Sequence, residues 1–328
     1  MSNPRNWNPW HGCRKYSEGC ENCYMFYLDQ MRGVPENSSN IYRTRDASKP
    51  LAKDAKGHFK IPSGFEISIN MTSDTFLEEA DEWRGDMWRV IRKRPDLIFY
   101  ILTKRVHRIE QCLPEDWGEG YENVMLNISV ENQRAFDERW PVLEKIPAKH
   151  KGMNIAPMLS EIDISPALAS GQIERVNLSG EGFDGRRPCR YEWIKRISDD
   201  CDRYKVNLII NMIGSVFIWD GTVYESRTFK EQTDLAQRTG LSRFFGKPSY
   251  RLFSPIDGHL LKEEELLVPV FNRDRCMDCP NLPVCSGCTD CGSCKNVVLV
   301  DAEGNPISNA KGSGADKLKS MSLEDFLR

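Results

Sequence analysis

Three cysteines near the amino terminus have a spacing suited to binding iron. Cys13, Cys20 and Cys23 form a C-x6-C-x2-C pattern within one short stretch. Three thiolates from one loop can bind three corners of a [4Fe-4S] cluster and leave the fourth iron open to a small-molecule ligand. The alternative is a structural zinc site that His11 or a distant cysteine completes, which would leave nothing reactive. Spacing alone does not separate the two, and spacing with context favours the cluster.

A second group of cysteines lies near the carboxyl terminus. Six of the twelve cysteines fall within residues 276–294, in the pattern C-x2-C-x5-C-x2-C-x2-C-x2-C. Such density predicts metal binding, and both ferredoxin-type iron-sulfur loops and zinc knuckles use C-x2-C pairs. The predicted ligands are Cys276, Cys279, Cys285, Cys288, Cys291 and Cys294.

Composition limits the class of protein. The 328 residues carry a net charge of −3, so no overall basic field points to nucleic acid. No apolar run reaches membrane-spanning length, and the first residues do not resemble a secretory leader. We therefore expect a cytoplasmic protein with no membrane partner, in which clustered cysteines bind metal rather than form disulfides.

Short apolar segments recur along the chain at intervals suited to strand-loop-helix units. Each begins more than twenty residues after the previous one, which is too far for hairpins. With a short strand near Trp7–Trp10, they predict an α/β fold, a partial parallel β/α barrel of six to seven strands. The segments are Ile67–Asn70, Ile98–Leu102, Val124–Ile128, Met153–Ile155, Val176–Leu178 and Leu208–Met212.

The remaining segments complete the predicted organisation. Apolar spacing predicts helices directly after Cys23, from about residue 76 to 90 and from 193 to 204, the last with Cys201 buried. Residues 33–64 read as an irregular excursion, and 215–265 as a covering layer. The domains are then residues 1–265, the barrel with its covering layer, 266–300, the cysteine-rich metal-binding extension, and 301–328, a polar tail.

Polar residues follow each predicted strand, where the functional residues of parallel β/α folds collect. They include Ser73 and Asp74 after the first, Lys104 after the second, and Ser129 and Glu131 around the third. For Ser73 and Asp74, capping of the next helix is an equal alternative to ligand contact.

The fifth strand ends in Ser-Gly-Glu-Gly, where Gly180 permits a tight turn beside the carboxylate of Glu181. Arg186 and Arg187 follow and could bind a carboxylate or phosphate. Cys189 is more simply structural.

These motifs together resemble the radical S-adenosylmethionine enzymes. More narrowly, the chain is similar to the phage-associated three-cysteine proteins, which share NPWxGC…S-x-GCxNCY at the start. The similarity also covers SDTF at 73–76, LTKR at 102–105, SVEN at 129–132 and GE-x-x-x-G-x-R-P from Gly180, so it spans roughly residues 6–215. The six-cysteine segment lies outside it.

The resemblance implies a function and a role for each matched residue. The cluster would bind S-adenosylmethionine and, with an electron donor, cleave it to a 5′-deoxyadenosyl radical that attacks a substrate. Tyr24 would shape the adenine side, Ser73 and Asp74 the methionine amino group, and Ser129 and Glu131 the ribose side. Lys104 would neutralise the carboxylate, and Glu181, with Gly180, would face the cofactor or substrate. The catalytic candidates are Lys104 and Glu181, and the six-cysteine segment would hold an auxiliary [4Fe-4S] cluster or zinc.

Two features depart from the pattern of these families. The usual radical enzyme loop is C-x3-C-x2-C, whereas six residues fill the first gap here. An acidic residue often precedes the proline at the fourth strand end, and this chain has Ala156 there. A carboxylate-dependent step at that position would be altered or lost.

Three functions remain for test. The first is a radical enzyme acting on an unknown substrate, for which phage-like kinship makes a nucleobase, nucleoside or nucleic acid a candidate. The second is a non-catalytic iron-sulfur or zinc protein that binds nucleic acid or regulates. The third is a protein that uses S-adenosylmethionine as a methyl donor. The polar residues at the strand ends favour the first.

Overall fold

The computed structural model describes residues 6–183, 187–246, 249–262, 265–266, 269–270 and 298–299. The six predicted carboxyl-terminal metal ligands and the polar tail lie outside the described residues. Two short strands, β13 (Pro269–Val270) and β14 (Val298–Leu299), come before and after the six cysteines in the sequence and pair antiparallel.

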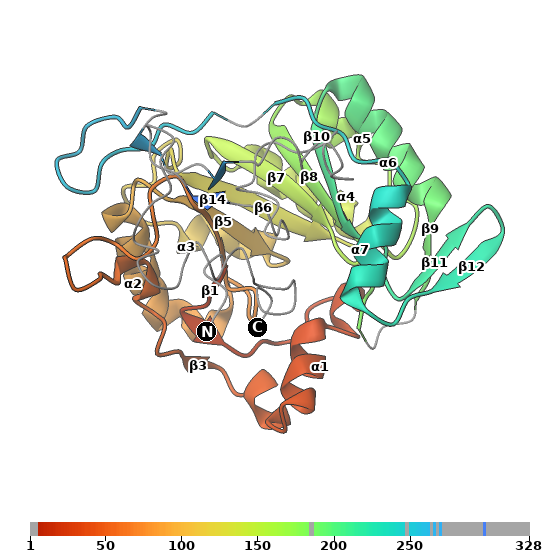
Figure 1. Cartoon of the computed structure of the whole chain (residues 1–328), viewed down its shortest axis with the longest axis horizontal. Helices are drawn as coiled ribbons and strands as arrows, with labels where there is room; N and C mark the ends of the chain where they lie inside the picture. Colours follow the sequence, from red (N-terminus) through yellow and green to blue (C-terminus); the bar gives the residue numbers. More distant parts are fainter. Residues whose placement is uncertain are drawn as a thin grey trace.

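A seven-stranded parallel sheet forms the centre of the fold, and its strands follow one another in chain order. All seven predicted strands are confirmed, including the short first one. Figure 1 shows the curved sheet with β5 to β8 at its centre. The strands are β1 (Asn6–Trp7), β4 (Glu66–Ile69), β5 (Ile98–Thr103), β6 (Val124–Val130), β7 (His150–Ile155), β8 (Ile173–Ser179) and β10 (Asn207–Met212).

The sheet curls into a half-barrel, and an ion pair across its inner face records the curvature. Arg175 on β8 donates to Glu66 on β4 at 3.0 and 2.9 Å, although three strands lie between them in the sheet. Side chains alternate between the faces of a strand, so the neighbours Ile67 and Val176 point to the outer face and join the apolar core. The inner face is therefore the polar one.

Several helices pack against the sheet: α4 (Gln133–Lys145) contacts β6, and α6 (Tyr191–Tyr204) and α7 (Phe229–Arg238) contact β10. Figure 1 shows α5 (Ser165–Ala169) and α6 beside β8 and β10. The other helices are α1 (Tyr24–Met31), which stands apart from the sheet in Figure 1, α2 (Asp81–Lys93) and α3 (Ile109–Cys112). Short 3-10 turns cover Glu18–Cys20, Pro35–Ser38, Lys49–Leu51, Glu78–Ala80 and Val106–Arg108.

Helix positions were predicted better than helix starts. The helix after Cys23 exists as α1. The apolar spacing of Tyr24, Tyr27, Leu28 and Met31 predicts that this face packs inward, but Met31 is 67% exposed and Met25 is buried instead. The second helix begins at Asp81 rather than near Phe76, because the chain first makes the 3-10 turn before it. In α6, Cys201 is fully buried, as the spacing predicted.

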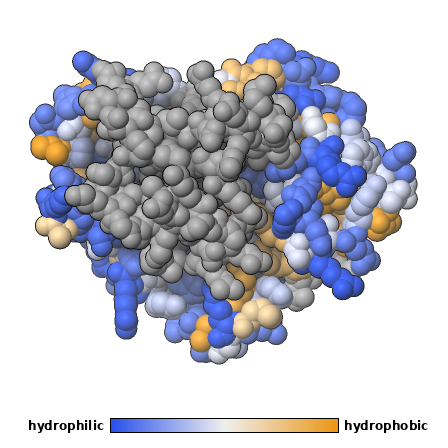
Figure 2. Space-filling view, in the orientation of Figure 1, coloured by the Kyte–Doolittle hydropathy of each residue, from blue (hydrophilic) through white to orange (hydrophobic). Residues whose placement is uncertain are grey.

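Smaller elements surround the half-barrel. β2 (Trp10–His11) pairs with β3 (Tyr42–Arg43), and β9 (Cys189–Arg190), β11 (Val216–Trp219) and β12 (Thr222–Glu225) form a three-stranded sheet. The β11–β12 hairpin projects from the molecule (Figure 1). In Figure 2, the coloured surface is mostly hydrophilic with scattered apolar side chains. Within the described residues, no helix combines the length and apolar character that a membrane crossing needs.

Candidate metal and cofactor site

The cysteine loop joins β2 to α1 and is anchored at its start. The amide of Gly12 donates to the carbonyl of Thr72 at 3.2 Å, and the amide of Cys13 donates to the carbonyl of Ser38 at 2.8 Å. Gly12 has φ +88°, and an added Cβ would lie 2.6 Å from a backbone oxygen of Asn40, so only glycine fits this turn. The start of the loop is therefore held by two later segments, the turn at Pro35–Ser38 and the residues after β4.

The segments that follow four strands of the half-barrel all contact this one loop. The loop thus lies at the carboxyl ends of the strands, where the sequence predicted it. The hydrogen bonds are Ser73 Oγ to the Gly12 carbonyl (2.6 Å), Arg105 Nη2 to the Arg14 carbonyl (2.9 Å), Asn132 Nδ2 to Glu18 Oε2 (3.0 Å) and Asn22 Nδ2 to Glu181 Oε2 (3.1 Å).

The three thiols are partly buried, and none of them forms a disulfide. Burial raises the pKa of Cys13 to about 12, with Asp74, Cys20 and Cys23 adding to the effect and Arg105 opposing it. Burial also raises the pKa of Cys23. Cys13 and Cys23 are therefore protonated at neutral pH, so a metal that binds them must release protons.

A three-cysteine cluster needs donors of this kind, and the loop supplies three thiols, of which Cys20 and Cys23 both act on the pKa of Cys13. Among the residues that the structure describes, however, no three His, Cys, Asp or Glu side chains surround a common metal position. The donor set fits the cluster by chemistry and location.

His11, the alternative fourth ligand, has its Nε2 committed to another partner. That atom lies 2.7 Å from Asp29 Oδ2, which also accepts a hydrogen bond from Ser38 Oγ at 2.8 Å. All three side chains are buried. Their contacts connect β2, α1 and the turn that anchors Cys13, so His11 supports the loop.

Asp74 accepts hydrogen bonds from several residues and does not act as the predicted helix cap. One carboxylate oxygen accepts from the Phe76 amide at 2.9 Å and from Thr103 Oγ1 at 2.7 Å. The other accepts from the Lys104 amide at 3.0 Å and lies 3.3 Å from Arg105. The carboxylate therefore fixes the end of β4 to the end of β5.

Glu131 is the centre of a buried charge cluster beside the loop. Its carboxylate is 2.8 and 3.2 Å from the two terminal nitrogens of Arg139 and 3.6 Å from Lys104 Nζ. Burial acts to raise the pKa of Glu131, but Lys104 and Arg139 outweigh it and lower the pKa to about 2. A Cβ on Gly19 of the cysteine loop would lie 3.1 Å from this carboxyl group, so loop and carboxylate are in contact.

The neighbours of Glu131 include two other predicted site residues. Ser129 is 4% exposed, and its carbonyl accepts from Arg139 at 2.6 Å. Lys104 Nζ also donates to the carbonyl of Ala156 at 3.2 Å and keeps 15% of its side chain exposed. Lys104 therefore connects the ends of β5, β6 and β7.

Glu181 is buried and paired with Arg187, which the sequence had offered to an external anion. Arg187 Nε lies 3.0 Å from both carboxylate oxygens, and Nη2 also donates to Oε1. The same guanidinium donates to the Glu18 carbonyl at 3.2 Å and to Glu21 Oε2 at 3.0 Å. Arg187 thus ties the end of β8 to the cysteine loop, and Arg186 lies outside the described residues.

Gly180 is explained by a close approach of two chain segments. A Cβ at this position would lie 2.1 Å from the carbonyl oxygen of Ile213. The Gly180 amide donates to the Met212 carbonyl at 2.9 Å, and the Ser215 amide donates to the Glu181 carbonyl at 2.7 Å. The glycine lets β8 and the end of β10 come together. The close neighbour of Gly180 is therefore backbone of the same chain, whereas the sequence suggested a ligand.

Tyr24, the predicted adenine contact, starts α1 and is held at both ends. Its hydroxyl donates to the Met71 carbonyl, and its ring stacks on Phe183 with the centroids 5.9 Å apart. Burial raises its pKa, so the hydroxyl stays a donor. Tyr24 therefore brings the end of β4 and the turn after Glu181 to the same end of the loop.

Two residues of this site escaped the sequence reasoning. Arg139 lies on α4, eight residues after its partner Glu131. The chain turns from strand β6 into helix α4 between them, and this turn brings the two side chains together. Tyr16 lies in the cysteine loop with the guanidinium groups of Arg105 and Arg139 at 5.1 and 5.7 Å from its ring centroid. A sequence signal for Arg139 does exist. It is an arginine on the buried face of a helix that begins shortly after a carboxylate at the end of a strand.

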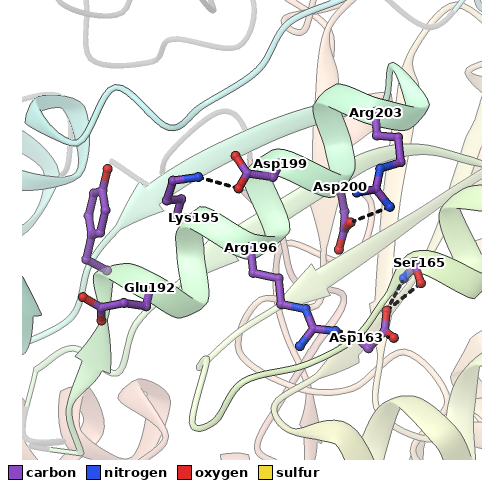
Figure 3. A pocket seen from close by; sticks show the side chains of 9 residues that line it. Asp163, Ser165, Glu192, Lys195, Arg196, Asp199, Asp200 and Arg203 are labelled. Carbon is purple, nitrogen blue, oxygen red and sulfur yellow. Dashed lines mark hydrogen bonds and ion pairs between the residues drawn. The ribbon is translucent and has the colours of Figure 1, made fainter.

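A surface pocket of about 570 Å³ lies elsewhere, along α6 (Figure 3). Its charged residues pair with one another: Lys195 with Asp199 at 2.5 Å, and Arg203 with Asp200 at 3.8 Å. Arg196 extends toward Asp163 at 3.5 Å. None of the residues that line this pocket takes part in the contacts with the cysteine loop described above.

The comparisons with known proteins give a family and no activity. No curated protein and no solved structure matches the chain. A family model described as "Protein of unknown function (DUF5131)" matches residues 3–238, which include the cysteine loop and the seven strands. The chain therefore belongs to the DUF5131 family of proteins of unknown function.

Proposed function

We propose that this protein is a radical S-adenosylmethionine enzyme. Cys13, Cys20 and Cys23 would hold a [4Fe-4S] cluster. When bound, such a cluster supplies an open iron for S-adenosylmethionine and an electron for its reductive cleavage. The cysteines outside the described residues would hold a second metal site, iron-sulfur or zinc.

One observation carries the proposal: hydrogen bonds join a loop with three thiols to the segments that follow four parallel strands. In β/α barrels, the groups that bind ligands come from these strand ends. A purely structural metal loop needs only its ligands, whereas this one is surrounded by a lysine, three buried carboxylates and three arginines. The arrangement supports a reactive site.

The side chains divide into supporting and ligand-facing groups. Ser73 and Asp74 use their oxygens on the loop and on the end of β5, so in this proposal they position the site. Lys104 keeps part of its side chain exposed and is the cation offered to the carboxylate of S-adenosylmethionine. Arg139 offsets the charge of Glu131, which leaves the lysine ammonium available to a second anion.

The test is anaerobic reconstitution with iron and sulfide, followed by reductant and S-adenosylmethionine. We expect cluster absorption in the wild-type protein and formation of 5′-deoxyadenosine. Cys20→Ala should lose 5′-deoxyadenosine formation and the iron bound by the three-cysteine loop, measured as the difference in iron content from the wild type. Cys112→Ala, which replaces a cysteine on α3 outside either group, should retain both. An intact cluster without 5′-deoxyadenosine would refute radical cleavage. Stoichiometric zinc in the three-cysteine loop, with no iron, would support the non-catalytic alternative.

A further inference from the structure

Two asparagines lie side by side on the inner face of the half-barrel. Asn154 on β7 is in register with Asn177 on β8 and with Ser129 on β6. The chain neighbours of both asparagines, such as Met153 and Val176, are fully buried in the outer apolar core. By strand alternation, both amides therefore point to the inner face.

A hydrogen-bond network fixes the orientation of both amides. Tyr100 on β5 donates to Asn154 Oδ1, while Asn177 Nδ2 donates to the Tyr100 hydroxyl at 2.7 Å and to Asn154 Oδ1 at 3.1 Å. Arg175 lies over the Tyr100 ring, 4.9 Å from its centroid, and is itself held by Glu66. The amides are thus preorganised by a chain of contacts that reaches across the sheet.

The network leaves one donor and one acceptor uncommitted within the described residues. Asn154 Nδ2 and Asn177 Oδ1 take no part in it, and both side chains are half-buried rather than enclosed. Turning both amides over would satisfy the tyrosine equally well and would again leave one donor and one acceptor. In either arrangement, one of the two neighbouring amides keeps an uncommitted donor and the other an uncommitted acceptor.

This pair lies just below the candidate site. Asn154 precedes Ala156 by two residues, and the Ala156 carbonyl accepts from Lys104 Nζ at 3.2 Å. At about 3.3 Å of rise per residue, the asparagine row is roughly 7 Å from that level of the strand ends. A molecule seated on the row would face the lysine and the cysteine loop.

The geometry points to a nucleobase as the ligand of this asparagine row. A nucleobase presents an acceptor and a donor next to each other on one edge, as in the lactam of uracil, and so matches the two amides. A trans peptide group does not match, because its N–H and C=O point to opposite sides. Binding of the base does not depend on the proposed function. Only a reaction of the bound base would rest on it.

The test is calorimetric titration of the full-length chain, without added iron, with the four ribonucleosides and with a ten-residue oligouridine. We expect at least one of these probes to bind, and Asn154→Ala and Asn177→Ala each to weaken binding tenfold or more. Gln111→Ala, which removes an exposed amide on α3, should bind like the wild type. Binding of the oligomer alone would identify a base within a nucleic acid, and binding of a nucleoside a free base or nucleoside.

A ligand change tests the same idea with the unaltered protein. If uridine binds, 3-methyluridine, which lacks the ring N–H, should bind at least tenfold more weakly. The inference is overturned if no probe binds, if both alanine variants bind as tightly as the wild type, or if the methyl group has no effect. These measurements need no cluster, so their failure is distinct from failure to form 5′-deoxyadenosine.

Discussion

Replacing Glu131 with Gln should destabilise the protein by an amount that depends on pH. The charged carboxylate is paired with Arg139 and Lys104, and its pKa falls from an ordinary 4.5 to about 2. Because each tenfold change in a proton dissociation constant is worth about 1.4 kcal/mol, the charged form contributes about 3 kcal/mol at neutral pH.

The sign follows from the lowered pKa. The contribution is fully present above the unfolded value of 4.5 and is lost as the pH falls toward 2, because the unfolded chain takes up the proton first. At pH 3 about 1 kcal/mol should remain. The variant should therefore be about 3 kcal/mol less stable than the wild type at pH 7 and about 1 kcal/mol less stable at pH 3.

Urea unfolding of both proteins, followed by circular dichroism at several pH values, measures the difference. Glu161→Gln is the matched control: Glu161 is also paired with an arginine, at 2.6 Å, but 53% of its side chain is exposed. It should cost less than about 1 kcal/mol at any pH. A stability difference for Glu131→Gln that stayed constant between pH 7 and pH 3 would refute the reasoning.

Two further substitutions test the contacts that hold the site. Gly180→Ala places a Cβ 2.1 Å from a carbonyl oxygen and should destabilise the protein by about 2 kcal/mol or more in thermal unfolding. Gly85→Ala, at a helical position with nothing within 4 Å, should instead stabilise it by about 1 kcal/mol. Arg187→Ala should speed hydrogen exchange in residues 18–23 at least tenfold by removing their contacts to the end of β8, whereas Arg203→Ala on α6 should not. Unchanged hydrogen exchange in Arg187→Ala would show that Arg187 does not hold the cysteine loop in place.

The sheet could be predicted because its signal is local. Buried parallel strands are short apolar runs, and six of the seven appear as such a run in the sequence. Helix starts were less accurate, since the 3-10 turn before Asp81 has the same apolar spacing as the helix that follows it. Helix α7 was missed, although Thr228 and Glu231 form a capping box that marks its start in the sequence.

The partners of the site residues could not be predicted, because they are set by tertiary contacts. The sequence offered Arg187 to an external anion, and the protein's own Glu181 occupies it. Gly180 was correctly singled out, but the segment that it admits lies more than thirty residues further on. His11 was weighed as a ligand, and its neighbour Asp29 gives it a supporting role.

The order of the strands in the sheet has a consequence for how the chain assembles. Each strand pairs with the one that precedes it in the sheet and in the sequence, from Asn6–Trp7 to Asn207–Met212. No strand has to enter between two that are already joined, so the sheet can be extended at one edge as the polypeptide leaves the ribosome. The cysteine loop is synthesised before the strand ends that contact it. These strand ends follow one after another during synthesis, and the last of them carries Glu181 and Arg187.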